Sequence, residues 1–313
     1  MGASGAYFAL SICLLALAFW HPLVTLVSLG LGSGHDADQY SHIMIIPLLC
    51  LYLVLRKRKL IFADAKSSIG PGISLLVSGL SFFVIAKLKQ GQLGQEGYFS
   101  LLMTSFVVLV IGAFVLFFGT RAFRLARFPL LVLALMIPFP SWFLGRTVSS
   151  LQDGSAVVTA FLLNLTGMPF VREGLVFHLP TNLNIFIAYD CSGIRSSIAL
   201  LIASLVASDI FLRKGWKKLV LNLAVLPLSL FKNGLRIATL SLLSVYVDPR
   251  FISGDLHRDG GILFYLIACG ILGLLLWQLR KSEAHPAFVT PAAHHEAAAS
   301  LKPIEAPFKK QTV

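Results

Sequence analysis

Apolar residues in this chain gather in long runs, not in the short alternating pattern of a soluble domain. Eight runs approach the roughly 20 apolar residues that a helix needs to cross a lipid bilayer. They cover residues 6–30, 41–55, 70–86, 98–118, 128–144, 191–211, 219–245 and 261–279. The run 41–55 is short and the run 128–144 contains two prolines, so we expect both to be tilted, kinked or partly re-entrant. The pattern predicts an all-α polytopic integral membrane protein with about eight transmembrane helices.

The composition agrees with a membrane protein. Hydrophobic residues make up 57% of the 313 residues and charged residues only 13%, whereas a soluble domain carries about 25% charged residues. The 26 Lys and Arg residues exceed the 14 Asp and Glu residues, which in isolation could indicate a nucleic-acid partner. The sequence has no soluble basic face or aromatic-interleaved groove, so we expect membrane lipid around the chain and no nucleic acid.

The basic residues follow every second apolar run. Lys and Arg accumulate in short cytoplasmic loops, so this alternation orients the helices and places both termini in the cytoplasm. We therefore expect a transmembrane domain over residues 1–281 and a disordered cytoplasmic tail over 282–313. Of the 26 basic residues, 17 lie on the predicted cytoplasmic side: Arg56, Lys57, Arg58, Lys59, Lys66, Arg121, Arg124, Arg127, Arg213, Lys214, Lys217, Lys218, Arg280, Lys281, Lys302, Lys309 and Lys310.

The longest loop on the opposite face, residues 145–190, is long enough to contain structure. The pattern of residues 150–166 within this loop predicts an amphipathic or interfacial helix. The stretch 171–189 alternates apolar and polar residues around Pro180-Thr181-Asn182. This alternation predicts a small extracytoplasmic β-hairpin at the membrane surface, directly before the sixth helix.

Cys191 is the cysteine with the best case for reactivity. We expect it to open the sixth helix, where the helix dipole stabilises a thiolate and Asp190 can cap the first turn. Arg195, at i+4, would then add a cation on the same helical face. The alternative is a small, buried and inert cysteine. That alternative is our assignment for the other three cysteines, Cys13, Cys50 and Cys269, which lie in apolar helices without nearby charge.

Arg236 lies inside the seventh apolar run, in its outer half. An arginine at that depth costs about 2.5 kcal/mol or more unless it faces the bundle interior or water. Lys232 at i−4 and Asn233 at i−3 share its side of the helix. Snorkelling to the interface is the alternative, but two cations in one hydrophobic helix favour a functional role.

His257 lies in the last outer loop, between two aspartates. A histidine there could be a plain surface residue, but it shares the outer ends of the last three helices with Cys191 and Arg236. A thiol, an imidazole and a guanidinium together suffice for acyl transfer through a thioester, because they supply nucleophile, acid/base and oxyanion partner. The sequence has no HxxxH, no HExxH and no second cysteine near Cys191, so we expect no metal and no cofactor.

Three segments together resemble the exosortase/archaeosortase family. They are Asp190-Cys191-Ser192-Gly193-Ile194-Arg195-Ser196, Asn233-Gly234-Leu235-Arg236-Ile237, and His257 ahead of a glycine-rich final helix. Tyr40-Ser41-His42 before Ile46-Pro47-Leu48 resembles the early motif of that family. The resemblance spans about 40 to 280 in the family's order. Two positions depart from it: Ile43 replaces a common glycine, and Ile262 replaces an aromatic residue after the last glycines.

The resemblance implies a bacterial inner-membrane cysteine transpeptidase with its active site on the extracytoplasmic face. Its partners would be secreted proteins that carry a C-terminal tripartite sorting signal with a Pro-Glu-Pro-like motif, and a cell-surface acceptor. By the same resemblance Cys191 is the nucleophile, Arg236 the oxyanion or substrate-carboxylate partner, and His257 the acid/base. Arg195 would be auxiliary, as would Asn233 of the second segment, and His42 matches a family histidine of unassigned role.

Two other functions remain open from the sequence. The chain could be a non-enzymatic component of exopolysaccharide machinery in which Lys232 and Arg236 bind an anionic lipid-linked sugar. It could also be an intramembrane cysteine protease that passes the acyl group to water. Only the first of these predicts that Cys191 is dispensable.

Overall fold

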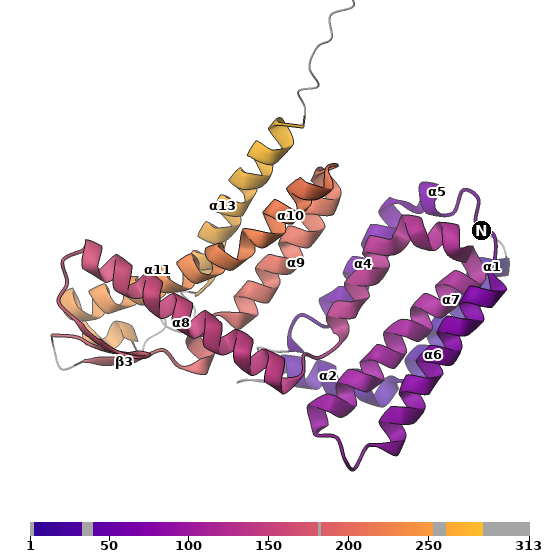
Figure 1. Ribbon diagram of the computed structural model, residues 1–313, viewed down its shortest axis with the longest axis horizontal. Helices are drawn as coiled ribbons and strands as arrows, with labels where there is room; N and C mark the ends of the chain where they lie inside the picture. Colours follow the sequence, from indigo (N-terminus) through magenta and orange to yellow (C-terminus); the bar gives the residue numbers. More distant parts are fainter. Residues whose placement is uncertain (1–2, 33–39, 181–182, 253–260, 284–313) are drawn as a thin grey trace, which may run out of the picture.

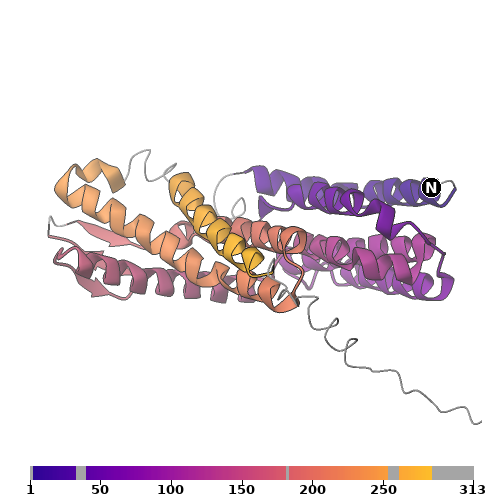
Figure 2. The same ribbon diagram turned by 90° about the horizontal axis from the view of Figure 1, so that it is seen from above.

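The computed structural model describes residues 3–32, 40–180, 183–252 and 261–283, and most of them are helical. The helices form two groups that follow one another along the long axis of the molecule (Figures 1 and 2). The first group contains α1 (Ala3–Ala18), α2 (Trp20–Leu31), α4 (Ile45–Arg56), α5 (Arg58–Ile61), α6 (Ile69–Leu88) and α7 (Gln95–Val132).

The second group holds the helices that carry the candidate site, together with a small sheet. After the short helix η1 (Leu133–Met136) come α8 (Ser141–Leu165), β1 (Val171–Glu173), β2 (Val176–His178), β3 (Asn184–Phe186), η2 (Tyr189–Ser192), α9 (Ile194–Phe211), α10 (Gly215–Leu223), α11 (Val225–Tyr246), η3 (Pro249–Ile252) and α13 (Gly261–Lys281).

Five helical segments among the described residues are long and apolar enough to cross a bilayer, and α1 with α2, bent by 70°, would make a sixth. The predicted count of eight is therefore not confirmed. The run 41–55 contributes α4, which has only 12 residues. The run 128–144 is not one helix, because it divides among the end of α7, η1 and a non-helical segment before α8. Pro138 and Pro140 lie in that segment, where their missing N–H groups interrupt helical hydrogen bonding.

Gly119 breaks α7 at the point where the chain changes direction. Its φ is 84°, in the left-handed region, and a side chain there would collide with the backbone carbonyl of Lys66. The first N–H after the break, that of Thr120, donates to Ser68 Oγ (3.3 Å). The break therefore depends on glycine and on a partner from the loop before α6.

The amphipathic helix expected over 150–166 is present as α8, but it begins nine residues earlier, at Ser141. Pro140, the N-cap residue, marks its start. Gln152, Ser155 and Thr159 are buried on one face of α8, and this face packs on α11. The helix thus buries a polar stripe that carries hydrogen bonds.

A small antiparallel sheet leads the chain to Cys191, with strand order β1-β2-β3. The sequence predicted a two-stranded hairpin, whereas the structure pairs β2 with β3 and adds β1 at the other edge of β2. Phe177, at the centre of β2, is 1% exposed. It belongs to a core with Leu163 of α8 and Ile237 of α11, and Cys191 packs against this core.

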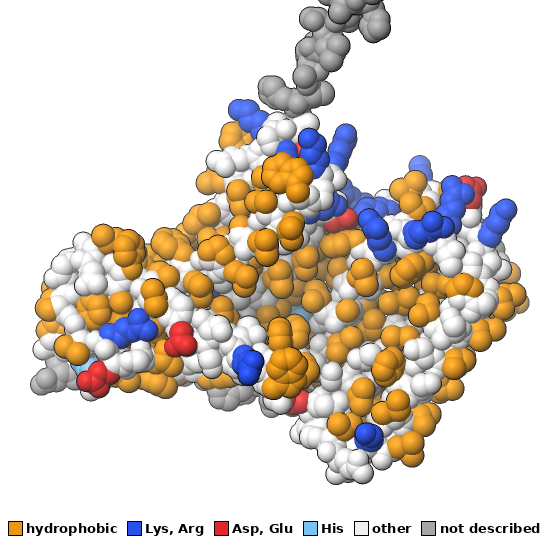
Figure 3. Space-filling model, in the orientation of Figure 1, with side chains coloured by type: hydrophobic (Ala, Val, Ile, Leu, Met, Phe, Trp, Pro, Cys, Tyr) orange, Lys and Arg blue, Asp and Glu red, His pale blue; other side chains and the backbone are white. Residues whose placement is uncertain are grey.

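Many of the Lys and Arg side chains gather along one edge of the molecule, over α5 and the ends of α10 and α13, and a few others lie apart from it (Figure 3). The flanks of the apolar helices are covered by hydrophobic side chains instead. On α6, for example, Ile73, Val77, Leu80 and Val84 are 45–59% exposed. Such an apolar exterior suits lipid and not water.

Candidate active site

Cys191 lies in η2, one turn before α9, and not in α9 itself. The helix α9 begins at Ile194 with Gly193 as its N-cap residue. The expectation that Cys191 opens the helix with Asp190 as cap is therefore wrong, and so is the i+4 argument that linked Cys191 to Arg195. The physical reason is Gly193, whose φ of 74° ends any continuous helix between the two residues.

Gly193 also permits a close approach between the Cys191 turn and α11. A Cβ at Gly193 would lie 3.1 Å from Asn233 Oδ1 and 3.5 Å from Lys232 Nζ. The left-handed φ and the tight contact both require glycine at this position. Two side chains of α11 consequently reach the backbone that follows Cys191.

Two buried amides fix the backbone on either side of Cys191. Asn233 Nδ2 donates to the carbonyl oxygen of Cys191 (2.8 Å) and is also bonded to Ser155 Oγ (3.1 Å). Gln152 Nε2 donates to the carbonyl oxygen of Ile187, at 2.8 Å. Asn233 is 1% exposed and Gln152 is 9% exposed, so neither bond competes freely with water. The segment that carries Cys191 is therefore held by α8 and α11 together.

Lys232 supplies a cation to this segment. It is 4% exposed, and its Nζ donates a hydrogen bond to Ser196 Oγ in the first turn of α9. The hydroxyl groups of Ser196 and Ser197 in turn donate to the carbonyl oxygen of Gly193, at 3.0 and 2.9 Å. A buried ammonium group thus lies against the Gly193–Ser197 turn.

Arg236 lies one turn beyond Asn233 on α11, half-buried. Its guanidinium carbon and Nη1 are each 4.0 Å from the position that a Cβ at Gly261 would take. Gly261 is the first residue of α13. The helix α11 thereby connects the Cys191 turn, through Asn233, with the start of α13, through Arg236.

His257 lies outside the described residues. His42 is described and lies in the turn before α4, where its Nε2 is hydrogen-bonded to the carbonyl oxygen of Leu135 (3.0 Å). It lines a pocket of about 550 Å³ together with Arg195 of α9 and Tyr265 of α13. The structure thus brings His42 and Arg195 together, and it brings Cys191, Asn233 and Lys232 together.

Sequence reasoning missed Gln152 and Ser155 as members of this site. Both lie on α8, which the sequence predicted only as an amphipathic or interfacial helix. A signal was available, because Gln152, Ser155 and Thr159 are polar residues on one face of an otherwise apolar helical stripe. Polar groups on a buried helix face need hydrogen-bond partners, and here the partner is the backbone near Cys191.

The arrangement suits thiol chemistry on an acyl group. Lys232 lies against the turn that follows Cys191, and Arg236 lies one turn further along α11. Cations favour both a thiolate and a tetrahedral oxyanion. Within the described ranges, no group of three His, Cys, Asp or Glu side chains could hold a metal ion.

Comparison with known proteins gives one match. A family model described as "transmembrane exosortase" matches residues 34–274, most of the chain. The match includes the Cys191 turn, α11 and His257. Neither the curated proteins nor the solved structures that were compared gave a match.

Proposed function

The chain belongs to the family of transmembrane exosortases, and from this premise we propose that it is a membrane-embedded cysteine transpeptidase. Its substrates would be secreted proteins with a C-terminal sorting signal, a Pro-Glu-Pro-like motif followed by a transmembrane helix and a basic end. The enzyme would cleave near the motif and transfer the protein to a cell-surface acceptor.

In the proposed reaction the Cys191 thiolate attacks the carbonyl carbon of the scissile peptide bond. The oxyanion that forms is stabilised by the Arg236 guanidinium. His257 protonates the departing amine as the C–N bond breaks, which leaves a thioester on Cys191. A nucleophile of the acceptor, deprotonated by His257, then attacks the thioester and restores the thiol.

The observation that carries this proposal is the pair of contacts made by α11. Asn233 donates to the carbonyl oxygen of Cys191 (2.8 Å), and Arg236 lies against Gly261. His257 precedes Gly261 by four residues in the sequence, so we assign it to the Arg236 end of this arrangement. We assign Asn233 and Lys232 as positioning residues. We assign His42 and Arg195, which line the neighbouring pocket, as auxiliary residues.

We further propose the bacterial inner membrane as the location, with both termini in the cytoplasm and Cys191 on the extracytoplasmic face. The gathering of Lys and Arg along one edge supports this orientation (Figure 3). The helix α9 has Cys191 before its first residue and Arg213 just after its last. Its two ends therefore carry the candidate nucleophile and a basic loop.

Co-expression with a secreted reporter that carries such a signal tests the function. Wild type should shorten the reporter, and Cys191→Ala should abolish the shortened product. Cys13→Ala is the matched control, because Cys13 is exposed on α1, in the first group of helices. Processing by Cys191→Ala at the wild-type rate would reject the thiol mechanism.

A further inference from the structure

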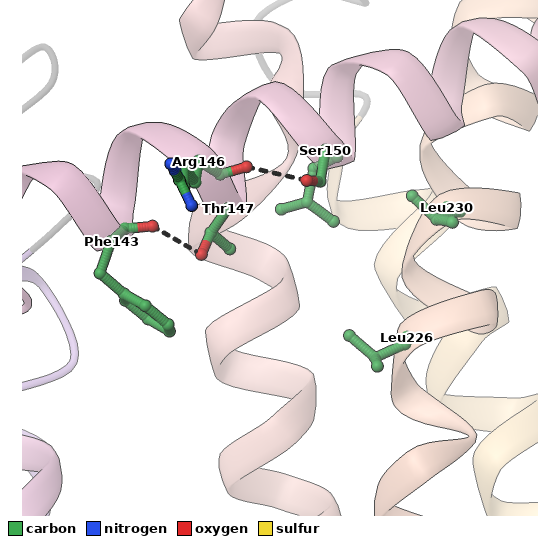
Figure 4. Close-up of a pocket in the computed structure, with 7 residues that line it drawn as sticks. Phe143, Arg146, Thr147, Ser150, Leu226 and Leu230 are labelled. Atoms are coloured by element: carbon green, nitrogen blue, oxygen red, sulfur yellow. Dashed lines mark hydrogen bonds between the residues drawn. The ribbon is translucent and has the colours of Figure 1, made fainter.

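A groove of about 440 Å³ opens between α8 and α11. Its walls are apolar and come from both helices: Phe143 and Leu151 on α8, Leu226 and Leu230 on α11. In the close-up, Phe143, Leu226 and Leu230 point into one space below α8 (Figure 4). Phe143 and Leu226 are 43% and 62% exposed, so the groove opens to the lipid-facing exterior.

One cation lies at this otherwise apolar groove. Arg146 is exposed, and within the described part of the chain its guanidinium has no hydrogen bond or ion pair. The two hydroxyl groups of the groove are already used as donors, since Thr147 donates to the Phe143 carbonyl (2.8 Å) and Ser150 to the Arg146 carbonyl (2.9 Å) (Figure 4). Arg146 is therefore the side chain here that can still donate.

We propose that this groove binds one anionic phospholipid, with an acyl chain on the apolar walls and the phosphate against Arg146. A guanidinium matches a phosphate with two parallel hydrogen bonds. The apolar walls give a sugar or a free ion no further polar partner, whereas they suit a hydrocarbon chain. The phosphate of an anionic headgroup attracts Arg146 with its full charge. In a zwitterionic headgroup the ammonium group of the lipid partly cancels this attraction.

The groove shares its walls with the support of the Cys191 turn. Leu230 packs so closely on Gly154 of α8 that a Cβ there would lie 2.8 Å from it. The next residue of α8, Ser155, is hydrogen-bonded to Asn233, which lies about one turn beyond Leu230 on α11. A lipid in the groove would therefore brace the α8–α11 pair that positions Cys191. Lipid binding itself does not depend on the proposed catalysis.

Native mass spectrometry of the purified full-length protein tests the inference without any turnover. Phosphatidylglycerol and phosphatidylcholine with identical acyl chains are titrated separately, and inorganic phosphate is added as competitor. Arg146→Gln should weaken phosphatidylglycerol binding about tenfold, the value expected for one charge-assisted contact, and should change phosphatidylcholine binding little. Arg250→Gln on η3, also exposed and outside the groove, is the matched control and should bind as wild type.

Leu226→Trp should fill the groove and weaken the binding of both lipids. Leu223→Trp, at a similarly exposed site on α10, should leave the binding of both lipids unchanged.

Equal binding of the two lipids by wild type, or equal binding by the Arg146 and Arg250 variants, would overturn the proposal. Displacement of the lipid by millimolar phosphate would identify a free-anion site instead. If Arg146→Gln fails to fold, wild type is labelled with a photoreactive phosphatidylglycerol and the labelled peptides are identified. The proposal predicts labels within residues 143–151 and 226–230, and labels elsewhere would contradict the site.

Discussion

Truncation of Asn233 to alanine is the sharpest test of how the Cys191 turn is held. The variant loses two hydrogen bonds, at 2.8 Å to the carbonyl oxygen of Cys191 and at 3.1 Å to Ser155 Oγ. Each bond contributes roughly 1 kcal/mol, and a buried acceptor left without its donor costs roughly 1–3 kcal/mol. The active arrangement of the turn should therefore lose about 2–4 kcal/mol relative to displaced arrangements. At about 1.4 kcal/mol per factor of ten, processing should fall roughly 30- to 1000-fold.

The assay compares the rate of reporter processing with the thermal unfolding temperature in detergent. Asn222→Ala is the matched control, because Asn222 is also a helical asparagine that bonds a neighbouring helix, with Ser204 Oγ 2.7 Å from its Oδ1. Both variants should lower the unfolding temperature, but only Asn233→Ala should lose processing by the larger factor. Processing by Asn233→Ala within threefold of wild type, or an equal loss in both variants, would refute the positioning argument.

Three further predictions concern a glycine, an ion pair and a carboxylate. Gly193→Ala should lower the free energy of unfolding by about 1–2 kcal/mol, because alanine is strained at a left-handed φ, and it should abolish processing, because the new methyl group would press on α11. Gly167→Ala, at φ 72° with open space around it, should lower the free energy of unfolding by a similar amount and leave processing intact. Asp209→Asn should lower the free energy of unfolding, measured by denaturant titration, by about 2 kcal/mol, since the Asp209 side chain is 8% exposed and lies between two lysines. Asp64→Asn, which removes an exposed ion pair, should change the same quantity by less than about 0.5 kcal/mol. Two backbone N–H groups before α10 lower the pKa of Glu283, so its contribution to stability is present above the ordinary value of 4.5 and is lost as pH falls through the lowered pKa. Glu283→Gln should accordingly reduce the unfolding temperature at pH 7 but not below that lowered pKa, and an equal reduction at both pH values would contradict the assignment.

The long apolar helices were predictable from the sequence because their length alone identifies them. The runs 70–86, 191–211 and 261–279 correspond to α6, α9 and α13 within a few residues. Lipid-exposed helices are selected for apolar composition along their whole length, so a length criterion suffices for them. The criterion fails for α8, whose buried face is polar and whose start is set by Pro140.

The candidate site could be predicted in residue type but not in geometry. The break at Gly193 depends on a left-handed φ that the sequence Cys-Ser-Gly permits without requiring. The partners of the turn come from far along the chain: Gln152 bonds a residue 35 positions away, and Asn233 bonds one 42 positions away. Such contacts arise from helix packing, which the local pattern around Cys191 does not encode. This is why the sequence pointed to Arg195 through a helical spacing, whereas the contact of Lys232 with Ser196 was found only in the structure.

The most direct test of the central claim is to find the acyl-enzyme itself. Wild type is co-expressed with the reporter, quenched in acid and digested, and the peptide containing Cys191 is examined by mass spectrometry before and after hydroxylamine. The account predicts a peptide carrying the reporter's C-terminal fragment upstream of the cleavage site, released by hydroxylamine and absent from Cys191→Ala. Reporter cleavage with no hydroxylamine-sensitive adduct on Cys191, or with the adduct on another cysteine, would contradict it.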